Sequence, residues 1–406
     1  MSFNIALTGL NAANQDLSVT ANNLANVATT GFKGSRAEFA DLFASSQQGV
    51  SATAVGNGVA VSEVAQQFGQ GNIETTGNNL DMAISGNGFF TLSDNGALTY
   101  TRNGEFQLDK NGNVVTAQGL HLQVYPPLAN GGFNTGGLAD LSLNTNQSAP
   151  QATSTAQITA NLPANAAKPV NAFTPTDPNS YNNSTSLTVY DSLGAAHTAT
   201  LYFIKGAVAN AWSSQLYIDG TAVGTPQALT YSNTGALTAP ANGQVAFPAY
   251  TPATGAAAMS VTFDFSQTTQ YGDNFGVTAV SQNGFTTGKL TGVSVDSTGV
   301  VQARFTNGRS INLGQIAMAN FANPQGLQQL GNANWSATNA SGAAVDGVAG
   351  NSGFGTIASG SLEHSNVDTT SALVEMIVAQ RDFQANAQMI QTDNQITQTV
   401  INIRNG

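Results

Sequence analysis

The chain has 406 residues, of which 41% are hydrophobic and only 8% are charged, with a formal net charge of −11 and no cysteine. Its 11 Lys and Arg residues are spread along the sequence, which argues against binding to nucleic acid or to an anionic membrane, because both need clustered cations. Disulfides, thiolate nucleophiles and cysteine-bound zinc are excluded. The surface must be rich in amides and hydroxyls, and such a surface suits a protein that packs against copies of itself.

Residues 1–30 predict an amphipathic helix. Apolar and small side chains recur at alternating steps of four and three residues, the spacing of a heptad row, with Asn14 in its one gap: Phe3, Leu7, Leu10, Leu17, Ala21, Leu24 and Ala28. The first basic residue is Lys33 and polar residues interrupt the apolar positions, so we expect no cleaved signal peptide. No run approaches the ~18 apolar residues of a transmembrane helix, so we expect no membrane insertion.

The middle of the chain predicts β-structure. Residues 31–75, together with 359–367, are expected to form an extended connector. Residues 76–144 and 285–358 are expected to form an inner β-domain, because turn dipeptides separate short alternating runs; these are Asn87-Gly88, Asn95-Gly96, Asn103-Gly104, Asn111-Gly112 and Gln118-Gly119.

The composition shifts near residue 145, where Pro, Ala, Asn and Thr become frequent. We therefore expect residues 145–284 to form an outer β-domain inserted into a loop of the inner one, since loop tips tolerate insertions. Expected strands in and after this insertion are 186–190, 199–204, 214–218, 259–265, 289–295, 300–305 and 309–320.

Residues 368–406 predict a second helix, with N-cap candidates at Asp368 to Ser371. Its heptad row has polar positions at Gln380, Asn394 and Thr397, and its other members are Leu373, Met376, Phe383, Ala387, Ile390 and Ile401. Neither terminal helix has neighbouring sequence to cover its row, and isolated helices of this kind are unstable. We therefore expect residues 1–30 and 368–406 to pair as a coiled-coil domain. The predicted fold is mainly β, with two nested β-domains and paired terminal α-helices.

No set of residues predicts catalysis or a cofactor. His121, His197 and His364 are not at metal-ligand spacing. The loop Asp109–Asn113 lacks the Gly and the Glu that a calcium loop needs, and Gly86-Asn87-Gly88 lacks the third glycine of a dinucleotide loop. We predict no catalytic, cofactor-binding or metal-binding residue, no cofactor, and no enzyme.

Three blocks of the sequence, in this order, resemble the flagellar rod and hook family of axial proteins. The first is Asn22–Lys33, read as NNLANVATTGFK, followed by Phe39–Leu42. The second is GNGFF at 86–90 with YTRNGEF at 100–106, and the third is SGSLEHSNVD at 359–368 with VEMI at 374–377 and Gln380-Arg381. The motif residues of the first block are Asn22, Asn23, Asn26, Thr30, Gly31, Phe32 and Lys33.

The inserted region favours the hook branch of this family. Residues 187–194 (LTVYDSLG), with His197 and the strand through Phe203, resemble the outer domain of flagellar hook proteins, whereas distal rod proteins are shorter and lack such an insertion. One departure is the segment 121–125, where the family usually has a further glycine. A rod-type axial subunit remains an alternative, as does a secreted adhesin or binding module with helical ends.

The resemblance implies a structural subunit that polymerises into the curved tubular hook, a flexible universal joint that transmits motor torque from rod to filament. It implies an extracellular place on the flagellum, reached by type III export without a cleaved signal peptide. It also implies partners: copies of itself, a distal rod protein, a hook cap protein, a hook–filament junction protein and the export apparatus. In such a tube the helical ends form the inner wall and the β-domains the outer layers.

We expect the helical rows to carry polymerisation through Leu7, Leu10, Leu17, Leu24, Phe383, Ile390 and Ile401. Thr30–Lys33 is expected to turn the chain out of the first helix, because Gly31 accepts the left-handed backbone that commonly ends a helix.

Overall fold

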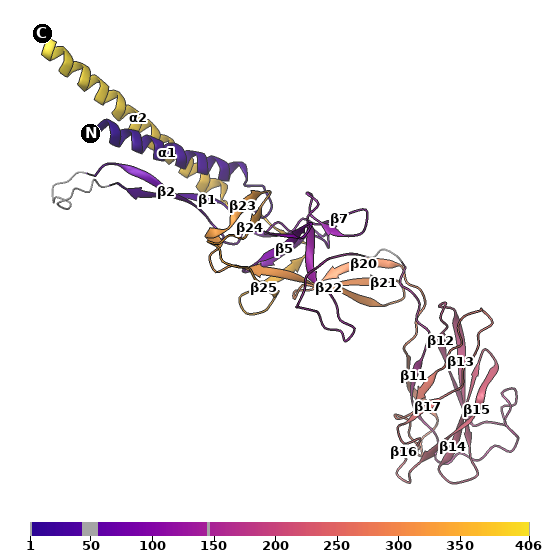
Figure 1. Cartoon of the computed structure of the whole chain (residues 1–406). Coiled ribbons are helices and arrows are strands. Elements are labelled where there is room, and N and C mark those ends of the chain that lie inside the picture. Colours follow the sequence, from indigo (N-terminus) through magenta and orange to yellow (C-terminus); the bar gives the residue numbers. More distant parts are fainter. Residues whose placement is uncertain (1, 43–55, 144–146, 406) are drawn as a thin grey trace. The chain divides into compact units, whose positions relative to one another are not determined.

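The computed structural model describes residues 2–42, 56–143 and 147–405 (Figure 1). Contacts divide the chain into two compact units. The first comprises Met1–Asn144, Gly292–Arg304 and Ser310–Gly406, and the second comprises Thr145–Thr291 and Phe305–Arg309. The predicted domain boundary near residue 145, and residues 43–55 of the predicted connector, lie outside the described residues.

The first unit begins and ends with helices α1 (Ser2–Ala25) and α2 (Thr369–Asn405). They lie side by side and run antiparallel, so that both chain ends are at the same end of the pair, and α2 reaches further (Figure 1). Helix α1 is shorter than the predicted 1–30, because residues 26–30 form turns, with Thr29 N donating to Asn26 O. Helix α2 begins where predicted, with Asp368 Oδ1 accepting from Ser371 N at 2.7 Å.

The segment after α1 contains strands. Strands β1 (Ser35–Asp41) and β2 (Val59–Gln66) pair antiparallel and pack on α1, with Val59 N donating to Thr8 Oγ1 at 3.4 Å. Strand β3 (Ile73–Thr75) pairs with β27 (Ser361–Glu363), and β4 (Met82–Ser85) pairs with β26 (Thr356–Ser359). Residues from the two ends of the chain therefore share the same small sheets.

The large sheet of the first unit has the strand order β20-β21-β22-β9-β5-β6-β24-β23 along its main path. The hairpin between β5 and β6 turns at Asn95 (φ 49°) and Gly96 (φ 100°), the positive angles that an Asn-Gly hairpin turn requires. The bounds of the strands are β5 Phe89–Asp94, β6 Ala97–Thr101, β7 Gln107–Leu108, β8 Val114–Val115, β9 His121–Tyr125, β10 Ala139–Asp140, β20 Leu290–Val295, β21 Val300–Phe305, β22 Ser310–Asn320, β23 Gln328–Gly331, β24 Asn334–Ser336 and β25 Val345–Val348; the 3₁₀-helix η1 spans Pro324–Gly326.

Two buried clusters hold this sheet. One is aliphatic and includes Ile84, Leu92 and Ile316. The other is aromatic, with Phe89, Tyr100, Phe321 and Trp335 packed largely edge to face at ring-centroid distances of 4.8 to 6.0 Å. Edge-to-face packing of this kind adds to the free energy gained from burial.

The second unit consists of two sheets around one core. Their strand orders are β12-β13-β14-β15-β16 and β17-β18-β11-β19. Burial alternates along β13, whose inward Leu201 and Phe203 are fully buried beside Ile158, Phe263 and Phe265. The bounds are β11 Thr155–Asn161, β12 Asn183–Tyr190, β13 Ala196–Lys205, β14 Ala211–Ile218, β15 Thr221–Tyr231, β16 Leu237–Ala239, β17 Gln244–Ala246, β18 Thr262–Asp264 and β19 Gly276–Gln282. The predicted fold class, mainly β with helices at both ends, is confirmed.

A buried histidine ties three segments of the second unit together. His197, 6% exposed, lies between Asp219 (Nδ1 to Oδ2, 2.5 Å) and Asp191 (Nε2 to Oδ2, 3.2 Å). Thr254 Oγ1 donates to Asp191 Oδ2 at 2.7 Å, and Tyr250 OH donates to Asp219 at 3.5 Å.

The charges of this cluster stabilise one another. Burial alone would lower the pKa of His197, but its hydrogen bonds with Asp219 and Asp191 and their negative charges outweigh burial and raise it above 6.5. Burial would likewise raise the pKa of Asp191, yet hydrogen bonds from Thr254, His197 and two backbone amides lower it to about 2. The imidazolium form therefore stabilises the fold.

We predict that the second unit loses stability as the pH rises through the raised pKa of His197. The stabilisation is fully present below the ordinary value of 6.5, because a raised native pKa favours the protonated native state. The test is urea unfolding at several pH values, followed by the fluorescence of Trp212 in a Trp335→Phe background. His197→Gln should flatten this pH dependence. The control is His121→Gln in the other unit, and an equal flattening there would contradict the prediction.

Candidate functional site

The seam between α1 and α2 is built from small side chains. Ala6 and Ala13 of α1, and Ala372 and Ala379 of α2, are buried. Gly9 of α1 lies opposite Asn386 of α2, and a Cβ added at Gly9 would lie 2.5 Å from Asn386 Oδ1. Because the distance between packed helices depends on the side chains at the contact, these residues let the two backbones approach closely.

The larger apolar side chains of α1 differ in their exposure along the helix. Phe3 and Leu7 are 41% and 39% exposed, and Leu10, Leu17 and Leu24 are half-buried. At about 100° per residue, the predicted row moves towards the seam from Phe3 to Leu24. Its N-terminal end is therefore the part that remains exposed.

On α2 the predicted row is partly on the seam. Met376, Phe383 and Ile390 are half-buried between Ala372, Ala379 and Asn386, whereas Leu373 is 45% exposed. Beyond Ile390, four apolar side chains of α2 are 48% to 76% exposed in the described structure: Ile396, Val400, Ile401 and Ile403. Of the predicted interface residues, Leu7 and Ile401 are the most exposed.

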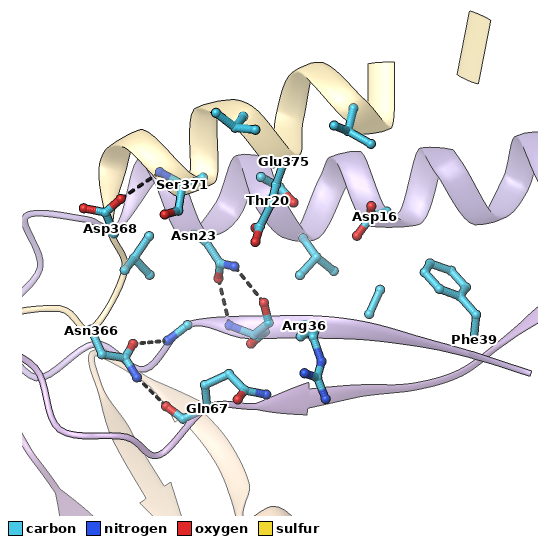
Figure 2. Close-up of a pocket in the computed structure, with 18 residues that line it drawn as sticks. Asp16, Thr20, Asn23, Arg36, Phe39, Gln67, Asn366, Asp368, Ser371 and Glu375 are labelled. Carbon is cyan, nitrogen blue, oxygen red and sulfur yellow. Dashed lines mark hydrogen bonds between the residues drawn. The ribbon is translucent and has the colours of Figure 1, made fainter. Parts of the chain in front are cut away.

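A groove of about 630 Å³ lies between α1, α2 and β1 (Figure 2). Asp16, Val19, Thr20 and Asn23 of α1 line it, as do Ala37 and Phe39 of β1 and Val374 and Val378 of α2. Its apolar side chains are flanked by carboxylates from Asp16, Asp368 and Glu375 and by the cation of Arg36. Burial, and in second place the charge of Asp382, raises the pKa of Asp16, so the groove already disfavours a negative charge there.

A buried cluster of three charges lies where the chain leaves α1. Lys33 Nζ is 2.6 Å from Glu363 Oε1, and both side chains are fully buried. Arg102, whose side chain is 6% exposed, reaches Glu363 Oε2 at 3.2 Å. Burial lowers the pKa of both Lys33 and Arg102, and the charge of Glu363 opposes that shift.

Further hydrogen bonds support this cluster, although the buried Arg102 Nε has no hydrogen-bond partner among the described residues. Lys33 Nζ donates to Gly69 O at 2.8 Å, Gly71 N donates to Glu363 Oε1 at 2.8 Å, and Arg102 donates to Gly86 O at 2.7 Å. A buried ion pair is tolerated when its charges have such partners. The cluster therefore fixes four parts of the chain to one another: the turn after α1, the segment before β3, the end of β6 and strand β27.

The motif residues around Lys33 have defined places. Gly31 has φ 68°, and a Cβ there would lie 2.5 Å from Asn103 N. Its amide donates to Glu363 O at 2.7 Å, and Thr30 Oγ1 donates to Glu105 Oε1 at 2.8 Å. The predicted role of Gly31 in a left-handed turn agrees with this geometry. Phe32 is half-buried, and its amide donates to Thr29 O at 3.2 Å.

The motif asparagines act on the backbone. Asn23 Nδ2 donates to Ser35 O at 2.7 Å, and Asn23 Oδ1 accepts from Ser35 N at 2.8 Å (Figure 2). Asn26 Nδ2 donates to Asn22 O and Oδ1, each at 3.0 Å. Near the other end of the chain, Asn366 Oδ1 accepts from Gly34 N at 2.8 Å. These amides hold β1 beside α1 and beside the start of α2.

Three residues of this site were not singled out from the sequence: Arg102, Glu363 and Asn366. All stand within the blocks that resemble the rod and hook family, but no spacing links them to Lys33. The sequence feature that could have pointed to the charged pair is the presence of Lys and Arg within apolar blocks of a chain with few charges. A charged residue in such a block needs a partner.

The described residues contain no group of His, Cys, Asp or Glu side chains that could hold a metal ion. His121 lies 3.4 Å from Asp140 Oδ2, and His364 lies 2.9 Å from Glu74 Oε2. Among the helices that the structure describes, none combines the length and the apolar character needed to cross a membrane.

Four family models match parts of the chain. They are the flagella basal body rod protein at residues 3–33, the flagellar hook protein FlgE/F/G D1 domain at 83–167, the flagellar basal body protein FlaE D2 domain at 161–285, and the flagellar basal body rod FlgEFG protein C-terminal region at 358–403. The first and last of these contain α1 and most of α2.

Full-length relatives decide the family. The flagellar hook proteins FlgE of Salmonella typhimurium and Escherichia coli are 40% and 41% identical to this chain, over 100% of both sequences in each case. The chain belongs to the flagellar hook protein family. That family is made of structural proteins of the bacterial flagellum and not of enzymes, and its models are shared with the basal body rod proteins. The predicted absence of enzymatic activity is therefore confirmed.

The fold has a counterpart among solved structures. The crystal structure of the Helicobacter pylori flagellar hook protein FlgE2 covers 70% of this chain and 98% of its own, with a TM-score of 0.52 and 14% sequence identity. At that identity the similarity shows the shared fold alone.

We predict that Lys33→Met lowers the free energy of unfolding of the first unit by about 3–5 kcal/mol, because it leaves Glu363 buried without its nearest partner. Denaturant unfolding followed by Trp335 fluorescence in a Trp212→Phe background measures this loss. The matched control is Arg36→Met, because the pair of Arg36 with Glu38 is 67% and 43% exposed. It should change the free energy by less than about 1 kcal/mol, and similar losses in both variants would contradict the buried-charge argument.

We also predict that Gly31→Ala destabilises the first unit by about 1–3 kcal/mol or more, since a left-handed backbone strains a residue with a Cβ and that Cβ would contact the backbone at Asn103. Gly137 is a suitable control, because its φ is not positive and a Cβ there would meet nothing within 4 Å. Thermal unfolding of Gly31→Ala and Gly137→Ala should show a lower midpoint only in the former.

Proposed function

We propose that the chain is the structural subunit that polymerises into the curved tubular flagellar hook, the flexible universal joint that transmits motor torque from the rod to the filament. The observation that carries this proposal is the distribution of side chains on the two terminal helices. Small residues occupy much of their mutual seam, whereas Phe3 and Leu7 of α1 and the apolar side chains of α2 beyond Ile390 remain exposed. Membership of the hook protein family and the low charge of the whole chain support the same conclusion.

Polymerisation is assigned to the helical rows, namely Leu7, Leu10, Leu17, Leu24, Phe383, Ile390 and Ile401. Leu7 and Ile401 are exposed and free to contact a second copy. Phe383 and Ile390 lie half-buried on the seam, so they hold α2 in position for such contacts. Exposed apolar rows of this length are unusual on a monomeric surface and are typical of association sites.

The buried charge cluster would provide the rigid attachment that torque transmission needs. Lys33, Arg102 and Glu363 join the helical pair to the large sheet through a contact with little exposed surface. A joint that transmits torque needs rigid attachment of its polymerising helices to the rest of the subunit. The family motif residues from Asn22 to Lys33 belong to this attachment, and not to a ligand site.

We further propose the domain organisation that the sequence suggests. Residues 1–30 with 368–406 form the polymerising helical domain, 31–75 with 359–367 the connector, 76–144 with 285–358 the inner β-domain, and 145–284 the outer β-domain. The partners are further copies, a distal rod protein, a hook cap protein, a hook–filament junction protein and the export apparatus. The place is extracellular, on the flagellum, after export without a cleaved signal peptide.

The test is assembly of the purified chain. Electron microscopy of concentrated protein at raised salt should show tubes, and deletion of residues 1–25 should abolish them. Each of Leu7→Ala and Leu10→Ala should raise the critical concentration about tenfold, since burying a leucine contributes roughly 1.5–3 kcal/mol. Asn11→Ala, an exposed polar position on the same helix, is the control. A binding module with helical ends predicts no tubes from the intact chain.

A further inference from the structure

The groove and the outer apolar row of α1 lie on opposite sides of the same helix. At about 100° per residue, the side that carries Asp16, Val19 and Asn23 into the groove is about half a turn from the centre of the row Phe3, Leu7 and Leu10. A single subunit therefore presents a concave apolar surface on one side of α1 and a convex apolar row on the other.

The two surfaces match in length. The groove follows α1 from Asp16 to Asn23, and the apolar row runs from the exposed Phe3 and Leu7 to the half-buried Leu10, so each spans about 10 Å at 1.5 Å per residue. Side chains at positions i, i+4 and i+7 are the usual anchors of a helix that lies in an apolar groove. The walls that would receive these anchors are Ala37, Phe39, Val374 and Val378.

The two surfaces also match in charge. The segment Ser2–Leu10 carries no charged side chain, and it includes the N-terminal turns of α1, where the helix dipole is positive. The groove is flanked by three carboxylates, from Asp16, Asp368 and Glu375, and by one cation, from Arg36. An uncharged row next to a positive helix pole fits this surface, whereas an acidic partner would be repelled.

We propose that the groove of one subunit, formed by α1, β1 and α2, receives the Phe3–Leu7–Leu10 row of α1 from a second copy. The inference rests on the proposed polymerisation and names its donor and acceptor surfaces. Because donor and acceptor are different surfaces, each added copy leaves one donor and one acceptor free. Contacts of this head-to-tail kind produce rings or open helical assemblies and not closed two-fold dimers.

The pairing fixes a displacement between neighbours. The donor row lies about 13 residues from the groove along α1, so successive copies whose α1 helices run parallel are shifted by about 20 Å along the helix axis. A reconstruction of the assembled tube measures this shift directly.

The decisive experiment uses engineered cysteines, since the chain has none. Leu7→Cys protein is mixed with Val378→Cys protein, assembled into tubes and mildly oxidised. The proposal expects disulfide-linked dimers from the mixture, and none from either variant alone. The matched control replaces Val378→Cys with Ile377→Cys: both native side chains are 50% exposed, but Ile377 points about 100° away from Val378 around α2.

The outcomes distinguish failure of the proposed docking from failure of the proposed polymerisation. Tubes without the Leu7–Val378 cross-link, or with equal linkage to Ile377, overturn the proposed docking and leave polymerisation intact. Homodimers of Leu7→Cys alone would indicate a two-fold contact and also overturn it. No tubes from the unaltered chain would overturn both proposals.

A second pair of variants keeps the test independent of cysteine chemistry. Val378→Glu places a charge on the wall of the groove and should raise the critical concentration for tubes by more than about tenfold, because an unpaired charge is costly to bury. Ile377→Glu, on the neighbouring face, should change it much less. Equal effects of the two substitutions would contradict the docking site.

Discussion

The ion pair between Lys33 and Glu363 is the contact on which the first unit depends. The two residues are 330 positions apart in sequence, and with Arg102 they bury three of the few charges in a chain that is 8% charged. An unpaired charge in this place is strongly unfavourable, so the turn after α1, the end of β6 and strand β27 must assemble together.

The helical pair shows how one seam can hold a subunit together and leave its larger apolar surface free. Gly9, Ala13 and Ala379 bring the backbones close, but they bury little apolar area. Phe3 and Leu7 of α1 and the isoleucines of α2 beyond Ile390 therefore remain available for other contacts. A subunit of this kind is only marginally stabilised at its ends until copies associate, since burial of those side chains supplies the missing free energy.

The second unit has its own hydrophobic core and its own buried polar cluster, centred on His197. Two sheets enclose Leu201, Phe203 and Phe265, and His197 links the turns on either side of it through Asp191 and Asp219. None of these contacts involves the helices or the charge cluster. Mutations in this unit are therefore expected to change its stability without altering the donor and acceptor surfaces on α1.

The sequence by itself determined the type and order of most elements, since heptad spacing, strand alternation and Asn-Gly turns are local signals. It located α1 and α2, the hairpin at Asn95-Gly96 and the family motif through Lys33. It could not determine which side of α1 faces α2, because the choice depends on the fit of Gly9 against Asn386. Nor could it show the partners of Lys33 or the groove that Phe39 lines, because those contacts join residues that only the tertiary structure brings together.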